Sequence, residues 1–408
     1  MTKPAPFFAA FRFSSFRFQW PSDLLASWAL EMEVLILNWF VLIETQSVTA
    51  LALFAGLQYL GSLIAPAMGA LADRVGRKRT LATLRALYAC LALLVMTLDL
   101  SGGLEAIYIF IIAAVAGLIR PSDLVMRNAL IGDTMPADRL ANAMGLSRMT
   151  MDSARVAGAL MGAGLLVTLG LGYAYAFVAL LYIASFCLTL GVAHVATANE
   201  SQTRPKPFAQ VMDGLRYVVR TPAVLALMWL AFLVNLTGYP LVSNSGLLSY
   251  VAREIYGLDA TGLSHLATSF GIGSLAASIV MAATGGAAKP VRLAFLGSAV
   301  WHLLLIAYGL STTKLEGLAV LGLIGFTQGI AMISMAVALL RLADASVRGR
   351  VMGVRMLAVY GLPLGLAATG SLTAALGFQA TVLTASTLGL ATIALIAWRW
   401  RAALFRAP

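Results

Sequence analysis

The residues best suited to chemistry in this chain are ionisable side chains that lie inside long apolar runs. The candidates for binding and releasing a proton are Glu31, Glu33, Arg120 and Asp123. A charge within an apolar run is costly, so such residues are functional candidates by default. A desolvated carboxylate favours its protonated form, whereas a nearby guanidinium favours the charged form. A carboxylate and an arginine that move apart could therefore bind a proton in one conformation and release it in another.

The polar stripe of the first apolar run selects between its two glutamates. At about 100° per residue, Ser27, Glu31 and Asn38 fall within a sector of about 60°, whereas Glu33 points nearly opposite to Glu31. We therefore predict that Glu31 faces a central cavity and carries the coupling proton, with Glu33 or Asp123 next in line. Arg120 is the candidate cation that would oppose the protonation of Glu31 if the two side chains lie close together. The alternative is that buried arginine and carboxylate only neutralise one another as a structural clamp.

Neutral polar side chains inside apolar runs are the candidates for binding a substrate. They are Ser27, Asn38, Asn235, Tyr239 and Gln328. The apolar runs of the second half of the chain carry mainly such neutral groups. We therefore predict that the charge chemistry belongs to the first half, and that the second half recognises more of the substrate's shape.

The sequence predicts no metal site, no cofactor and no enzymatic activity. His194, His265 and His302 lie on three different apolar runs at different depths, which argues against a metal site. Cys90 and Cys187 lie inside apolar runs, so neither a disulfide framework nor a thiolate site is predicted. No phosphate-binding G-x-x-x-x-G-K-[ST] motif and no nucleophile–base constellation is visible. An ion gradient is the remaining energy source.

The composition places these residues in a membrane protein. Of the 408 residues, 60% are hydrophobic and 11% are charged, whereas soluble proteins have about a quarter charged residues. The net charge of +11 arises from short basic clusters between apolar runs. Such clusters are typical of topology signals and of contacts with anionic lipid headgroups, not of a nucleic-acid-binding face.

The apolar segments are twelve in number, and each is long enough to cross a bilayer as a helix. They lie at about 18–45, 49–71, 80–99, 104–129, 142–169, 173–196, 222–250, 262–284, 291–311, 317–342, 352–376 and 379–400. Lysine and arginine concentrate in the even-numbered connections, so we predict that both termini are cytoplasmic. The predicted location is the cytoplasmic (inner) membrane of a bacterium.

A polar stretch at residues 197–221 divides the chain into six spans and six spans. We predict the following parts: a cytoplasmic interfacial lead-in at 1–17, an N-terminal six-helix bundle at 18–196, a cytoplasmic linker at 197–221, a C-terminal six-helix bundle at 222–400 and a cytoplasmic tail at 401–408. The linker looks helical over residues 208–220. Similar short stretches open the fifth and eleventh spans with an offset of 208 residues, which indicates an internal repeat.

The basic turn between the second and third spans carries the motif G-x-L-A-D-R-x-G-R-K-R at residues 69–79. This motif resembles the signature loop of the major facilitator superfamily. The resemblance implies an all-α membrane protein with twelve transmembrane helices in two six-helix bundles, working by alternating access. It also implies a conformational latch, which would comprise Gly69, Asp73, Arg74, Gly76, Arg77 and Arg127. We predict that Asp73 lies against the N-terminus of span 11, near Val351.

The pair Arg120-Pro121 and the P-x-x-x-L-A-N-A stretch at residues 136–143 narrow the resemblance. They are similar to a bacterial subgroup that includes the enterobactin exporter and macrolide efflux proteins. We therefore predict proton-coupled export of an amphipathic small molecule, such as a drug or a siderophore-like metabolite. The expected partners are this substrate, protons and membrane lipids, with no nucleic acid and a monomeric chain. Import of a siderophore or lipid-like solute is the alternative transport reaction, and a membrane-embedded enzyme or receptor is the alternative outside transport.

Overall fold

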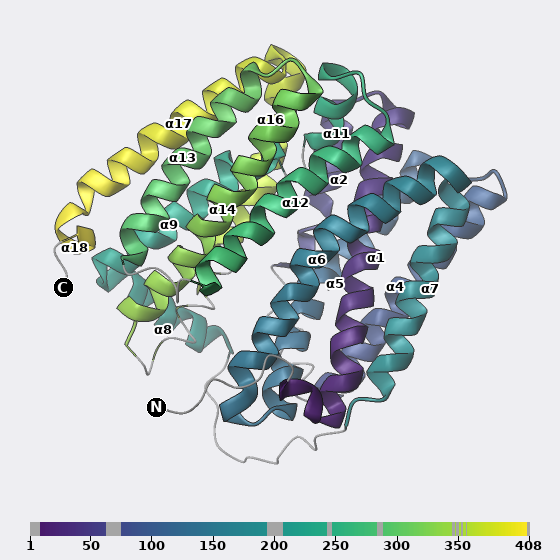
Figure 1. Ribbon diagram of the computed structural model, residues 1–408, viewed down its shortest axis with the longest axis horizontal. Helices are drawn as coiled ribbons and strands as arrows, with labels where there is room; N and C mark the ends of the chain where they lie inside the picture. Colours follow the sequence, from purple (N-terminus) through teal and green to yellow (C-terminus); the bar gives the residue numbers. More distant parts are fainter. Residues whose placement is uncertain are drawn as a thin grey trace. The chain divides into compact units, whose positions relative to one another are not determined.

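The computed structural model describes residues 9–62, 75–193, 207–242, 247–283, 289–344, 347, 351, 354–355 and 357–405. All the elements in these residues are helical (Figure 1). Within the described residues, 11 helices are long and apolar enough to cross a membrane. The shorter apolar helix α2 (Val48–Leu57) stands where the second span is predicted, and part of that predicted span lies outside the described residues. The prediction of an all-α membrane protein with about this number of spans is confirmed.

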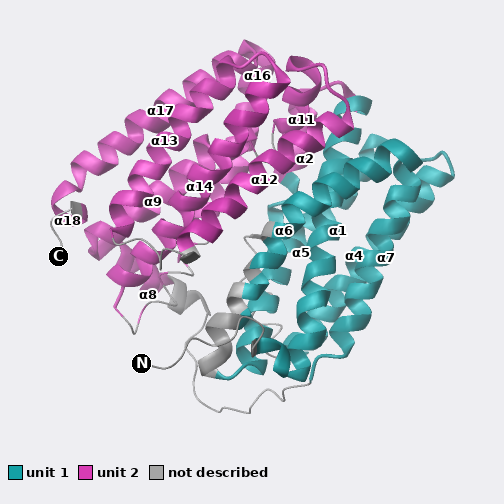
Figure 2. Cartoon of the chain, viewed as in Figure 1, with its two compact units in different colours: residues 1–44, 57–203 teal, residues 45–56, 204–408 magenta. Residues whose placement is uncertain are grey.

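The chain forms two compact units, which Figure 2 colours separately. Unit 1 comprises residues 1–44 and 57–203, and unit 2 comprises residues 45–56 and 204–408. The long helices of unit 1 are α1 (Ser14–Thr45), α4 (Arg77–Leu100), α5 (Ala106–Thr134), α6 (Ala137–Leu169) and α7 (Leu171–Leu190). Those of unit 2 are α9 (Pro222–Thr237), α12 (Ala260–Ala283), α13 (Pro290–Leu310), α14 (Lys314–Leu342), α16 (Gly361–Leu376) and α17 (Phe378–Arg399).

Shorter helical elements connect or extend these helices. In unit 1 they are η1 (Ala9–Arg12) and η2 (Leu60–Ser62). In unit 2, besides α2, they are α8 (Pro207–Arg220), α10 (Tyr239–Val242), α11 (Leu248–Tyr250), the π-helix η3 (Val251–Ile255), η4 (Ala358–Tyr360) and α18 (Arg401–Phe405). Helix α8 confirms the helical character predicted for the linker. One predicted span differs: the run at 222–250 is interrupted, because α9 ends at Thr237 and α10 begins at Tyr239.

The aromatic lead-in packs onto unit 1. Phe16 is fully buried in an apolar cluster that includes Ile131 of α5 and Leu146 of α6. Phe11 packs edge-on against Phe16 with ring centroids 5.2 Å apart. Trp20 Nε1–H donates to the backbone carbonyl of Leu146 at 3.0 Å. These contacts hold the beginning of α1 against α5 and α6. Helix α1 starts at Ser14, four residues before the predicted start of the first span at residue 18.

Small residues allow the long helices of unit 2 to approach closely. Both α12 and α13 pack along α14. A Cβ atom on Gly273 of α12 would collide with the backbone carbonyl of Gly322 in α14, and one on Gly325 of α14 would collide with the carbonyl of Phe270. Larger side chains at these positions would therefore force the two helices apart.

Two glycines end helices at corresponding points of the two halves. Gly170 lies between α6 and α7 with φ 83°, and Gly377 lies between α16 and α17 with φ 82°. Other residues are strained at such positive φ values, so glycine permits both tight connections. The glycines are 207 residues apart, close to the offset of 208 seen in the short sequence repeats. This agreement supports an internal repeat.

Candidate functional site

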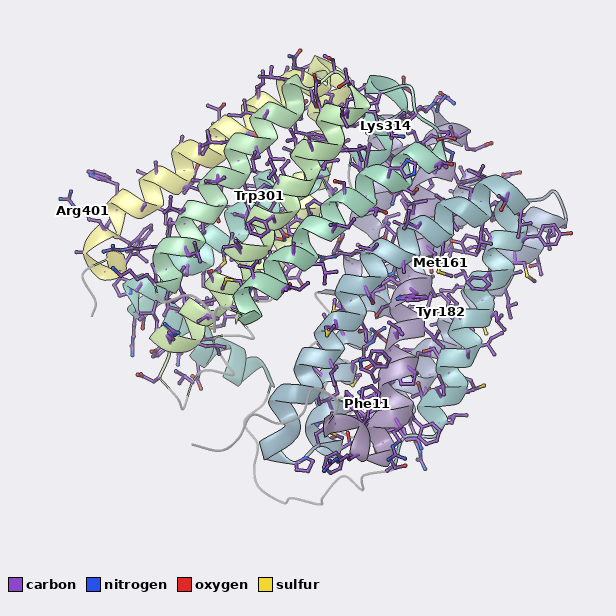
Figure 3. All side chains as sticks on the ribbon, viewed as in Figure 1. Phe11, Met161, Tyr182, Trp301, Lys314 and Arg401 are labelled. Atoms are coloured by element: carbon purple, nitrogen blue, oxygen red, sulfur yellow. The ribbon has the colours of Figure 1, made fainter. Side chains whose placement is uncertain are left out.

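An ion pair joins α1 and α5 in the interior of unit 1. Glu33 Oε1 lies 3.1 Å from Arg120 Nη2. The hydroxyl of Tyr182, which Figure 3 labels on α7, donates to Glu33 Oε2 at 2.8 Å. Arg120 Nη1 also donates to Gln58 Oε1. Because one of the two donors to Glu33 is a cation, protonation of Glu33 would remove much of the attraction that holds Arg120 in place.

A second charged cluster joins α1, α4 and α5. Arg85 of α4 is fully buried, donates to Asp23 Oδ1 and has its Nε 3.7 Å from Asp123 Oδ1. Arg127 Nε lies 2.5 Å from Asp123 Oδ2 and 3.7 Å from Asp23 Oδ1. We call Asp23, Arg85, Asp123 and Arg127 the charge quartet. The two arginines balance the charges of the two aspartates, so the charge quartet has no net charge.

Hydroxyl groups add hydrogen bonds to the two arginines of the charge quartet. Arg85 Nη1 donates to Ser22 Oγ and to Thr189 Oγ1 of α7, the latter at 2.7 Å. Arg127 Nη1 donates to Ser27 Oγ at 2.7 Å. Removing one partner from a buried ion pair costs about 3–5 kcal/mol, because the remaining charge is left uncompensated. The quartet therefore favours one mutual arrangement of α1, α4, α5 and α7.

The two glutamates of α1 lie on different sides of the helix. Arg120 pairs with Glu33, the glutamate that we placed second to Glu31. Glu31 lies on the side of α1 that faces α6, because a Cβ atom on Gly158 would lie 2.7 Å from Glu31 Cβ. Helical periodicity correctly placed the two glutamates on different faces of α1. The partners of Glu33 come from other helices, so the sequence of α1 alone could not identify them.

The neutral candidates of α1 are bonded within unit 1. Ser27 Oγ accepts from Arg127 and lies 2.7 Å from the Asp23 carbonyl, to which its hydroxyl can donate. Asn38 Nδ2 donates to the Val34 carbonyl at 2.6 Å. Asn38 Oδ1 is buried and has no hydrogen-bond partner among the described residues. Ser27 therefore supports the charge quartet, whereas Asn38 retains a buried acceptor.

The neutral candidates of unit 2 include one direct contact. Gln328 Nε2 donates to the Tyr239 hydroxyl at 2.8 Å, and the Tyr239 ring packs edge-on against Trp301, labelled in Figure 3, with centroids 5.7 Å apart. Asn235 Nδ2 donates at 2.8 Å to a carbonyl of its own helix. Gln328 follows Arg120 by 208 residues, which is the repeat offset. Unit 2 thus has a neutral pair at the repeat position where unit 1 has an ion pair.

The described residues contain no group of three or more histidine, cysteine, aspartate or glutamate side chains that could hold a metal ion. His265 Nδ1 lies 3.1 Å from Lys314 Nζ, and His302 is bonded to Thr237 and Ser298. His194 lies outside the described residues.

The family of the chain follows from its match to a known family over most of its length. Residues 20–366 match the family described as the Major Facilitator Superfamily. The chain belongs to this superfamily. The major facilitators are transporters and not enzymes, so the chain is a secondary transporter. No curated protein matches the chain.

Solved major facilitator structures share the fold of the chain at low sequence identity. A bacterial homolog of the human lysosomal transporter Spinster, in an inward-facing and unoccupied conformation, is 14% identical with a TM-score of 0.71, covering 95% of this chain and 98% of that one. The POT family transporter PepTSo is 11% identical with a TM-score of 0.75, covering 96% and 99%. The human organic anion transporter MFSD10 (TETRAN) is 15% identical with a TM-score of 0.69, covering 94% and 99%. These similarities establish the fold.

The superfamily's signature loop is described only in part. Some of the predicted latch residues lie outside the described residues, namely Gly69, Asp73 and Arg74. Gly76 has φ 101° and precedes α4, and Arg77 Nη1 pairs with Asp133 Oδ1 of α5 at 2.6 Å. Arg127 belongs to the charge quartet. The contact of Asp73 with the beginning of span 11 stays a prediction.

Among the residues that contact the predicted charged side chains, Arg85 and Tyr182 are two that sequence reasoning did not single out. Arg85 lies inside the apolar run at 80–99, so the criterion that selected Arg120 applies to it equally. Its nearness to the basic turn concealed that signal. Tyr182 is one of several tyrosines in its span, and nothing in the sequence separates it from Tyr173 or Tyr175.

Proposed function

We propose that this facilitator exports an amphipathic small molecule in exchange for protons, and that the Glu33–Arg120 pair is the proton-coupling site. The observation that carries the proposal is the burial of Glu33, 7% exposed, between a guanidinium and the Tyr182 hydroxyl. The charged carboxylate attracts Arg120, whereas the protonated carboxyl does not. Proton binding would therefore weaken the contact between α1 and α5 at Arg120, while the charge quartet still joins these helices, and would favour a different arrangement of this part of unit 1. Glu31 and Asp123 are the other carboxylates that could take this role.

The proposed direction of transport and the proposed class of substrate rest on the resemblance to the enterobactin exporter and macrolide efflux subgroup. The residues that carry this resemblance are Arg120-Pro121 and the loop after α5. The neutral pair of Tyr239 and Gln328 beside Trp301 supports a substrate that is mostly apolar with a few hydrogen-bonding groups. We place the protein in the bacterial inner membrane with both termini in the cytoplasm, since lysine and arginine concentrate in the connections on that side.

Transport by purified protein in proteoliposomes tests this proposal. A panel of fluorescent amphipathic dyes and siderophores would be screened for movement driven by an imposed pH gradient, and then for counterflow without a gradient. We expect Glu33→Gln to abolish the pH-driven movement and to retain counterflow, because exchange requires alternation but no net proton movement. Import driven by the gradient would contradict the direction that we propose.

Two matched variants on the same helix make the test specific. Glu44→Gln removes an exposed carboxylate of α1 and should leave both activities intact. Glu31→Gln should retain pH-driven transport if Glu33 carries the proton. If Glu31→Gln loses pH-driven transport while Glu33→Gln keeps it, the coupling site is Glu31 and the assignment to the buried pair is wrong.

A further inference from the structure

His302 of α13 is a fully buried imidazole in unit 2 that forms hydrogen bonds through both ring nitrogens. Nδ1 lies 2.8 Å from the backbone carbonyl of Ser298, and Nε2 lies 2.9 Å from Thr237 Oγ1 of α9. A carbonyl oxygen can only accept, so Nδ1 carries a hydrogen atom. Nε2 is therefore the atom at which the ring could gain or lose a proton.

The Thr237 hydroxyl is placed to serve both protonation states of His302. Thr237 Oγ1 also lies 3.0 Å from the carbonyl of Leu233. When Nε2 is bare, the hydroxyl can donate to it. When Nε2 is protonated, Nε2–H can donate to Oγ1 while the hydroxyl turns to donate to Leu233. Rotation of one hydroxyl thus satisfies every hydrogen of either state.

We propose that His302 is a proton-binding site of unit 2, with the Thr237 hydroxyl as the group that responds to its protonation. The proton comes from solution, forms the Nε2–H bond and adds one positive charge to the ring. The fold leaves room for this edge of the ring: a Cβ atom on Gly389 of α17 would collide with His302 Cδ2 and would lie 3.0 Å from Thr237 Oγ1.

The break in the seventh span gives the site a connection to the rest of unit 2. Thr237 is the last residue of α9, and Tyr239, which bonds to Gln328, begins α10. Protonation of His302 therefore changes a hydrogen bond at the end of α9, two residues from the Tyr239–Gln328 contact.

The hydrogen-bond partners of His302 in the described part of unit 2, Thr237 and Ser298, are both uncharged. The titratable groups of α10 and α13 include the phenols Tyr239 and Tyr308, which are neutral near pH 7. The charged residues of α13, α14, α17 and α18 lie at or near helix ends, and those described are Arg292, Lys314, Glu316, Arg341, Arg399 and Arg401. Along α13, Arg292 is about 15 Å from His302. Proton binding should therefore depend strongly on the hydrogen bond to Thr237.

Nitrogen NMR of the full-length protein in detergent tests the proposal directly. The chain has three histidines, so the double variant His194→Gln, His265→Gln leaves His302 as the only histidine signal. In this background, ¹⁵N-histidine should show a bare Nε2 near pH 8 and a doubly protonated ring near pH 5. Thr237→Val removes the partner of Nε2 in both states, but the bond from the charged ring is the stronger one, so the variant should weaken proton binding about tenfold and move the midpoint about one pH unit toward acid.

Two controls separate this effect from general perturbation. Thr237→Ser keeps the hydroxyl and should keep the midpoint, and Thr369→Val removes a hydroxyl that bonds to carbonyls of its own helix and should leave the midpoint unchanged. An imidazole that stays neutral from pH 8 to pH 5, or a midpoint that Thr237→Val does not move, would overturn the proposal. The titration of His302 should persist in Glu33→Gln. The His302 proposal and the proposed function of Glu33 can therefore fail independently of one another.

Discussion

Replacement of Arg85 by leucine tests whether the charge quartet acts as one unit. The substitution removes a fully buried cation that contacts Asp23 and faces Asp123, and leaves the quartet with one uncompensated negative charge. Loss of one partner from a buried pair costs about 3–5 kcal/mol of unfolding free energy. Adding Asp23→Asn restores neutrality and leaves Arg127 paired with Asp123 at 2.5 Å. We expect the double variant to be more stable than the sum of the single losses predicts, by about 0.5–3 kcal/mol.

Unfolding in mixed micelles by a denaturing detergent, followed by tryptophan fluorescence, would measure these differences. Arg216→Leu on α8 is the control, because its pair with Asp213 is 3.8 Å long and both side chains are about half exposed or more, at 68% and 48%. Exposed pairs contribute about 1 kcal/mol or less, so this variant should stay near the wild type. If the losses of Arg85→Leu and Asp23→Asn simply add, the quartet is not coupled and the reasoning is refuted.

Two further predictions concern topology and the signature loop. Single cysteines at Gln202 and Ser346, in a cysteine-free background, should react with an impermeant reagent only from the cytoplasmic side, and labelling of intact cells at residue 202 would contradict the orientation. Asp73→Asn should reduce transport while expression and substrate binding are retained, because a carboxylate at a helix N-terminus contributes about 0.3–1 kcal/mol when exposed. An unchanged transport rate in Asp73→Asn would contradict the latch and would mean that the loop only anchors the two helices at the membrane surface.

The positions of the spans were predictable because they depend on local composition. An uninterrupted apolar run predicts a helix whatever surrounds it, and α13 (Pro290–Leu310) matches the predicted 291–311 within one residue. The interruption between Thr237 and Tyr239 was not predicted, since hydropathy continues through it. Gly238 was the available signal, but a single glycine in an apolar run also fits an unbroken helix that packs closely.

The site was less predictable because its contacts join distant parts of the chain. Glu33 was placed second to Glu31 by the polar residues of its own helix. Its actual partners, Arg120 and Tyr182, are 87 and 149 residues away in the sequence. Helical periodicity shows which residues share a face, but it does not show which helix that face meets. Arg85 is the exception, since a charge inside an apolar run is visible without any knowledge of packing.

The most direct test of the central claim is to observe the protonation of Glu33 itself. Infrared difference spectra of the protein between neutral and acid pH detect the carbonyl stretch of a protonated carboxyl group, without any need for a known substrate. We predict a protonated-carboxyl band in the wild type that is absent from Glu33→Gln and retained in Glu31→Gln. A band that persists unchanged in Glu33→Gln would contradict the claim that this buried pair binds the coupling proton.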